Sequence, residues 1–111
     1  MFEKNLKLAA LLDFYGEVLS ERKQSVLSMY YNEDLSLAEI AEEIGISRQG
    51  VRELIKKAEE ELLFMEEKLG LQKRLREAML QSDVIFELLN REGASAELIG
   101  EMQTLVNILK Q

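Results

Sequence analysis

The chain has 111 residues, which is enough for one domain or for two closely joined helical halves. It contains no Cys and no His, which excludes disulfides, the usual zinc ligand sets and any catalytic triad that needs an imidazole base. Its formal net charge of −7 argues against a large nucleic-acid footprint unless Lys and Arg are clustered.

Apolar residues recur at helical spacing from the N-terminus onward, and proline, which breaks helix interiors, is absent. The spacing predicts a first helix over 5–19. Ser20 stands where an N-cap belongs, so a second helix should follow it and run to about Tyr31. The residues that this second helix is expected to bury are Val26, Leu27 and Tyr30.

The most specific motif is the segment 36–58, SLAEIAEEIGISRQGVRELIKKA. Ser36 and Glu39 match a capping box, which opens a short helix. Gly45 suits the left-handed conformation that ends a helix, and Ser47 is the N-cap of the next one. Two capped helices joined by a glycine turn predict a helix-turn-helix unit. Its packing positions are Ala41, Ile46, Val51 and Leu54.

The second helix of the motif continues its apolar pattern to Leu69, and Gly70 marks its end. Two further amphipathic helices are expected, over 71–90 and after Ser95. The sequence thus predicts an all-α protein of about six helices, with a helix-turn-helix domain at 1–69 and a C-terminal helical pair at 70–111. The apolar stripes of this pair are Leu71, Leu75, Met79, Ile85 and Leu89, widened by Val84 and Leu88, and then Leu98, Met102, Leu105 and Leu109.

These stripes hold more apolar residues than a chain of this length should hide, so we expect the C-terminal pair to pack on the first part or on a second subunit. Two-fold symmetry is common among helix-turn-helix proteins. The sequence therefore predicts a homodimer formed through the C-terminal helices.

The start of the second motif helix carries the candidate binding residues. At about 100° per residue, basic and amide side chains there share a sector beside the buried face. Such a unit presents this part of the helix to the major groove, where Arg can read guanine, Gln can read adenine and Lys can hold phosphate. A solvated face with ordinary surface charge is the alternative interpretation. The predicted nucleic-acid-binding residues are Ser47, Arg48, Gln49, Arg52, Lys56 and Lys57.

Residues 20–62 resemble the fourth conserved region of bacterial sigma factors in the runs SERKQSVLSMYY, LSLAEIAEEIGIS and RQGVRELIKKAEEEL. Nearly the whole chain, beginning FEKNLKLAALLDFYGEVLSERKQSVLSMYY, is similar to the YlxM family of small helix-turn-helix proteins of Gram-positive bacteria. This resemblance implies a DNA-binding or regulatory protein associated with the signal recognition particle pathway. One departure is the run Glu59–Glu61, where sigma-type units continue with basic residues. These carboxylates would repel a phosphate backbone.

Two functional hypotheses follow. The first is a DNA-binding transcription regulator, for which the signal recognition particle RNA is a second candidate ligand. The other is a protein adaptor that uses the motif as scaffold and docks its acidic C-terminal helices on a basic partner. For the adaptor, the resemblance implies the signal recognition particle GTPase or its RNA complex.

No paired acids in a pocket, metal-ligand set or Gly-rich phosphate loop points to an enzyme, a metal or a cofactor. No apolar run approaches the roughly 20 residues that span a bilayer, and no signal-peptide pattern follows the N-terminus. We therefore expect a cytoplasmic protein without membrane insertion. Tyr30 and Tyr31 could stack on bases, but core packing is the favoured interpretation.

Overall fold

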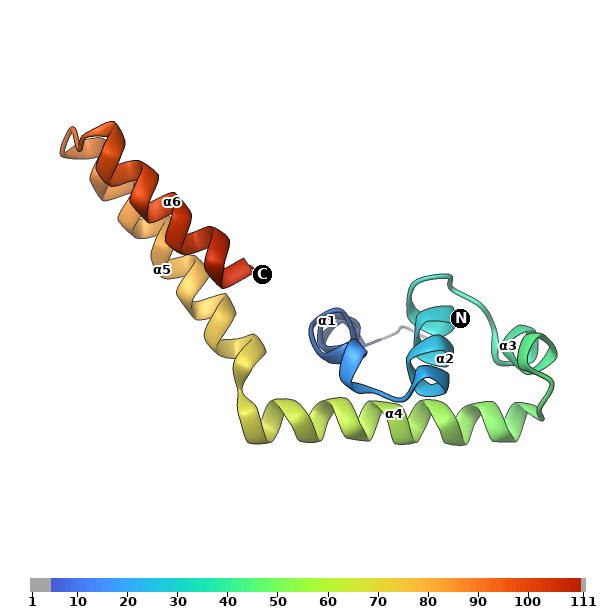
Figure 1. Cartoon of the computed structure of the whole chain (residues 1–111). Coiled ribbons are helices and arrows are strands. Elements are labelled where there is room, and N and C mark those ends of the chain that lie inside the picture. Colours follow the sequence, from blue (N-terminus) through green and yellow to red (C-terminus); the bar gives the residue numbers. More distant parts are fainter. Residues whose placement is uncertain (1–4, 111) are drawn as a thin grey trace. The chain divides into compact units, whose positions relative to one another are not determined.

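The computed structural model describes residues 5–110, and this range contains six α-helices, one short 3-10 helix and no strand (Figure 1). The predicted all-α fold is confirmed. The chain divides into two compact units, unit 1 (Met1–Gly70) and unit 2 (Leu71–Gln111). The elements are α1 (Leu6–Tyr15), η1 (Gly16–Val18), α2 (Glu21–Tyr31), α3 (Leu37–Ile44), α4 (Arg48–Leu69), α5 (Leu71–Arg91) and α6 (Ala96–Lys110).

Helix α4 is the spine of unit 1, because α1, α2 and α3 all pack against it (Figure 1). Its buried residues follow the period of an amphipathic helix, so one continuous face meets all three partners. The expected burial of the second helix is confirmed, since Val26 and Leu27 are fully buried and Tyr30 is only 8% exposed. The residues that α4 contributes to this core are Val51, Ile55, Ala58 and Leu62.

The first predicted helix, 5–19, is shorter in the structure. The α-helix ends at Tyr15, and Gly16–Val18 forms a 3-10 turn closed by a hydrogen bond of 3.1 Å from Leu19 N–H to the Gly16 carbonyl. This tightening directs Leu19 into the core, where it is 5% exposed. It also leaves Ser20 free to cap α2, because the Ser20 hydroxyl accepts from the N–H of Lys23.

The helix-turn-helix is formed as its caps predict. Ser36 accepts from Glu39 N–H at 3.1 Å, and Glu39 accepts from Ser36 N–H at 3.0 Å, which completes the capping box of α3. Gly45 ends α3 in the left-handed region, with φ at +73°. The Gly45 N–H still donates to the Ala41 carbonyl at 2.9 Å, so the chain turns without losing its last helical bond.

Unit 2 is an antiparallel pair of helices, α5 and α6, which lie side by side (Figure 1). Ser95 caps α6 by accepting from Leu98 N–H at 3.2 Å, as predicted. The packed face of α6 matches the expected stripe only in part: Met102 and Leu109 are half-buried as expected, but the buried residue is Val106, and Leu98 and Leu105 remain about half exposed. In a pair of helices each helix can bury only one narrow line of side chains, and on α6 this line runs through Val106.

Candidate nucleic-acid interface

The first turns of α4 are held in place by the turn that precedes them. The Ser47 hydroxyl accepts from Gly50 N–H at 3.0 Å, so this predicted site residue serves as the N-cap of α4. A Cβ at position 50 would lie 3.2 Å from Ile46 Cδ1. Gly50 therefore lets the turn pack closely on the helix. The sequence prediction did not recognise this role.

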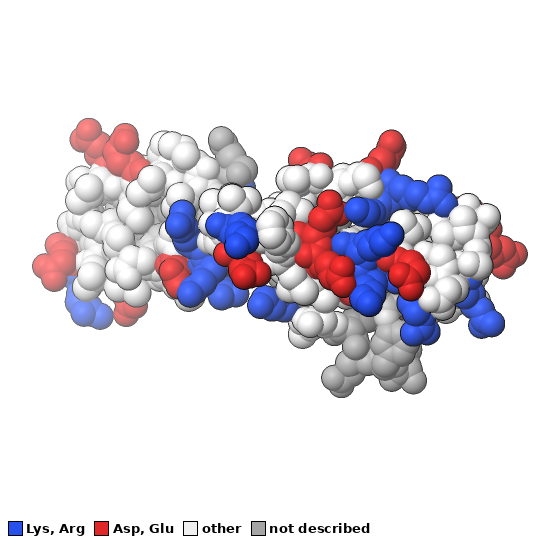
Figure 2. Space-filling model, turned by 90° about the horizontal axis from the view of Figure 1, so that it is seen from below, with Lys and Arg blue, Asp and Glu red and all other residues white. Residues whose placement is uncertain are grey.

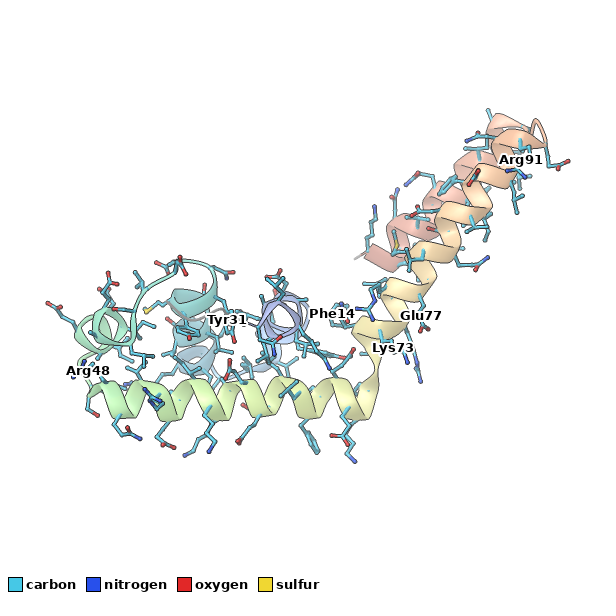
Figure 3. The ribbon with its side chains drawn as sticks, turned by 180° about the vertical axis from the view of Figure 1, so that it is seen from behind. Phe14, Tyr31, Arg48, Lys73, Glu77 and Arg91 are labelled. Atoms are coloured by element: carbon cyan, nitrogen blue, oxygen red, sulfur yellow. The ribbon has the colours of Figure 1, made fainter. Side chains whose placement is uncertain are left out.

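Arg48, Arg52 and Lys56 form an exposed basic row along the first turns of α4. They are four residues apart, so each lies about 40° further around the helix than the one before. Within the described part of the chain, none of the three is in an ion pair. Arg48 stands at the very start of the helix beside α3 (Figure 3). The row can therefore reach an external anion without breaking an ion pair.

The row lines a groove between α3 and α4. A hollow of about 740 Å³ lies between the first turn of α3 and the first turns of α4, and an adjoining hollow of about 370 Å³ shares two of its lining residues, Leu37 and Arg52. The sequence prediction did not include the α3 side. The capping box is the sequence signal that could have located this side of the groove, because Ser36 fixes where α3 begins. On this side the larger hollow is lined by the N-cap Ser36 and by Leu37 and Ala38 of α3.

Gln49 lies in the same sector of α4 as the basic row and lines the larger hollow together with Arg48 and Arg52, whereas Lys57 stands apart. Gln49 is exposed, and its Nε2 donates to Glu53 Oε1 at 3.1 Å, so a neighbouring carboxylate holds the amide. Lys57 lies about 100° around the helix from Lys56 and about 180° from Arg48, on a different side. The six predicted residues thus comprise a row of three, a helix cap, a paired amide and an outlying lysine.

The carboxylates that follow the row bind other helices of unit 1. Tyr31 donates its hydroxyl hydrogen bond to Glu59, and Lys23 forms an ion pair of 2.9 Å with Glu61. Burial, followed by the hydrogen bond and charge of Glu59, raises the pKa of Tyr31. Glu60 is exposed. Two of the three acids therefore attach α2 to α4.

The tyrosine pair belongs to this packing. Tyr30 is buried against the core, and its ring meets Tyr31 edge to face with centroids 5.1 Å apart. Burial raises the pKa of Tyr30. The core-packing interpretation of the pair is therefore supported for Tyr30, while half-buried Tyr31 is held by its hydrogen bond to Glu59.

The outer side of α4 has no continuous basic surface. Figure 2 shows Lys and Arg side chains interleaved with Asp and Glu along this side. Residues 35–58 hold four acidic and four basic side chains, and residues 59–111 hold eleven acidic and six basic ones. Residues 35–58 are thus neutral overall, whereas residues 59–111 have a net charge of −5.

The glycine turn, the two capped helices and the exposed start of the second one define a helix-turn-helix protein. A family model described as a helix-turn-helix protein, YlxM / p13 like, matches residues 2–105. The chain belongs to this YlxM / p13-like family, as the sequence resemblance predicted. The description of the family is that of a helix-turn-helix protein and not of an enzyme.

Bacterial relatives match most of the chain. A protein of Thermoanaerobacter sp. (strain X514) is 44% identical over 105 residues, which are 95% of this chain and 84% of the relative. A protein of Listeria welshimeri is 38% identical over 109 residues, which are 97% of this chain and 99% of the relative. Among the residues that the structure describes, no helix combines the length and apolar character needed to cross a membrane.

Proposed function

We propose that this chain is a cytoplasmic DNA-binding regulator that reads its target with the start of α4. The observation that carries the proposal is the basic row of Arg48, Arg52 and Lys56, exposed at the start of the second motif helix and without an ion pair among the described residues. A helix-turn-helix unit presents this part of its second helix to the major groove.

The side chains of the interface would contact different parts of the DNA. Arg52 lies one turn into the helix and lines both hollows, so it is the residue best placed to meet a guanine edge. Lys56 stands one turn further from the helix start and suits a phosphate contact. Gln49 would read adenine only after its amide leaves Glu53.

The acidic residues beyond the row limit the length of the interface. Glu59 lines the smaller hollow beside Lys56, and a phosphate close to it would be repelled. Contacts should therefore be confined to about the first two and a half turns of α4. A short interface on an acidic protein should bind weakly and lose affinity steeply with salt. A homodimer that binds two half-sites would offset this weakness, and we include a homodimer in the proposal.

The test is a titration of the full chain against genomic DNA fragments and against the signal recognition particle RNA at two salt concentrations. Arg52→Ala should weaken binding by about 1–3 kcal/mol and relax sequence preference, while Lys56→Ala should weaken binding evenly and lower the salt slope by about one. Arg22→Ala is the matched control, because Arg22 is also exposed in unit 1 but lies on α2. Equal affinities for the wild type and the Arg52 variant would refute the proposed interface.

The second candidate function is a protein adaptor, favoured by the interleaved charges on the outer side of α4 (Figure 2). In this function the motif is scaffold, and the partner is a signal recognition particle GTPase or its RNA complex. The decisive result would be a wild type that binds no DNA at low salt while the GTPase is retained on the immobilised chain. DNA binding that depends on Arg52 would instead support the regulator.

A further inference from the structure

Unit 2 has almost no core of its own. Among its described residues only Ser82 and Val106 are buried. Seven large apolar side chains of the same two helices are between 43% and 62% exposed. An antiparallel helix pair with so little burial needs a further surface to cover it. The exposed apolar residues are Leu71, Leu80, Val84, Leu88, Leu98, Leu105 and Ile108.

The exposed apolar residues favour one side of the helix pair. On α6, at about 100° per residue, Leu105 and Asn107 point to opposite sides of the buried Val106. On α5, Leu88 lies about 120° from the buried Ser82, and the antiparallel course places it on the same side as Leu105. The opposite side is polar. We call the side that carries Leu88, Leu98 and Leu105 the apolar side.

The charges of unit 2 separate along its length. The open end, residues 71–82 and 103–110, has four basic residues and one acidic residue, whereas the turn end, residues 83–102, has five acidic residues and one basic residue. The open end is thus +3 and the turn end −4. The basic residues of the open end are Lys73, Arg74, Arg76 and Lys110, and the acidic residues of the turn end are Asp83, Glu87, Glu92, Glu97 and Glu101.

We propose that the apolar side of unit 2 binds the apolar side of a second copy, antiparallel, so that the two helix pairs form a four-helix bundle. A two-fold axis then brings the turn end of each copy against the open end of the other, which pairs opposite charges twice. A parallel arrangement would bring like charges together. This proposal specifies the interface of the homodimer included in the proposed function, and it does not depend on what α4 binds.

The size of the apolar side fits a stable dimer. At 1.5 Å per residue, the 21 residues of α5 and the 15 of α6 form helices about 32 Å and 22 Å long, each about 10 Å wide. One side of the pair therefore projects roughly 550 Å². Because side chains protrude from the helices, the accessible area is larger than this projection and approaches the 800 Å² or so per partner that a standard interface buries.

Sedimentation equilibrium of the full chain tests the interface. The wild type should sediment at twice its 12.8 kDa at micromolar concentration. Leu105→Glu should raise the dimer dissociation constant at least about tenfold, since the charge would be buried in the interface. Asn107→Glu is the matched control, because it adds the same charge two residues along on the polar side, and it should remain dimeric. Circular dichroism shows whether each variant keeps its helices.

A charge exchange tests the orientation. Arg74→Glu and Glu101→Lys, each alone, should weaken the dimer, whereas the chain that carries both should regain the affinity of the wild type. A parallel dimer gains nothing from the double change. A monomeric wild type, a monomeric Asn107→Glu variant with intact helices, or a double variant no tighter than the single ones would each overturn the proposal. A monomeric wild type would remove the homodimer from the proposed function, but the Arg52 test of the α4 interface would stand by itself.

Discussion

Substitution of Gly45 separates backbone strain from side-chain packing. Gly45 has φ at +73°, and a Cβ built there meets no heavy atom within 4 Å. The cost of Gly45→Val therefore comes from the left-handed backbone alone, about 1–2 kcal/mol for an L-residue, with a β-branched side chain at the upper end. In a domain of this size that loss lowers the melting temperature by roughly 5–15 °C.

Thermal unfolding followed by circular dichroism is the assay. Gly45→Asn should lose clearly less than Gly45→Val, because Asn tolerates the left-handed region. Gly100→Ala is a control that should raise the melting temperature instead of lowering it. Its Cβ also meets open space, but Gly100 lies inside α6, where Ala is favoured over Gly by about 0.5–1 kcal/mol. An unchanged melting temperature for the Val variant, or equal losses for Val and Asn, would refute the strain argument.

Three further predictions concern unit 1. Because the pKa of Tyr31 is raised in the folded chain, the neutral hydroxyl contributes to the free energy of unfolding in full below the ordinary pKa near 10, and this contribution is lost as the pH rises above that value. Tyr31→Phe should therefore flatten the alkaline limb of a plot of stability against pH. An unchanged limb would argue against the hydrogen bond to Glu59. Ser36→Ala removes the hydroxyl that caps α3 and should cost about 0.5–2 kcal/mol in a urea titration, where a shift below that range would mean that the cap is dispensable. Leu62→Ala empties a fully buried position on α4 and should cost about 2–5 kcal/mol in the same titration, and a smaller loss would show that the core collapses around the gap.

Much of unit 1 could be predicted because single residues mark where its helices begin and end. Ser36, Gly45 and Ser47 each satisfy or redirect a helix end with their own atoms, so their positions fix α3 and the start of α4. The break at Gly16–Val18 has no such marker. It arises because Leu19 must reach the core, which is a tertiary requirement that periodicity does not report.

The candidate interface could be predicted only in part. The spacing of Arg48, Arg52 and Lys56 places them in one exposed row from sequence alone. The hydrogen bond from the Gln49 amide to Glu53, four residues further along the helix, follows the i,i+4 rule and could also have been expected. The bond between Tyr31 and Glu59 joins residues 28 apart in the chain, so no local pattern indicates it.

That long-range bond changes the meaning of the acidic run. Read along the sequence, Glu59–Glu61 opposes a phosphate backbone. In the fold, Glu59 accepts from Tyr31, Glu61 pairs with Lys23, and one turn further Glu66 accepts from the hydroxyl of Tyr15 at 2.7 Å.

Helix α4 therefore has two successive parts. Residues 48–56 present the exposed basic row, and from Glu59 onward carboxylates bind α2 and α1 to the same helix. A basic continuation of the row would lengthen a nucleic-acid interface, but it would remove the acceptors that orient the first two helices on the spine. The acidic run is accordingly explained by the assembly of unit 1, and it limits any interface on α4 to the first turns, where no such attachment is made.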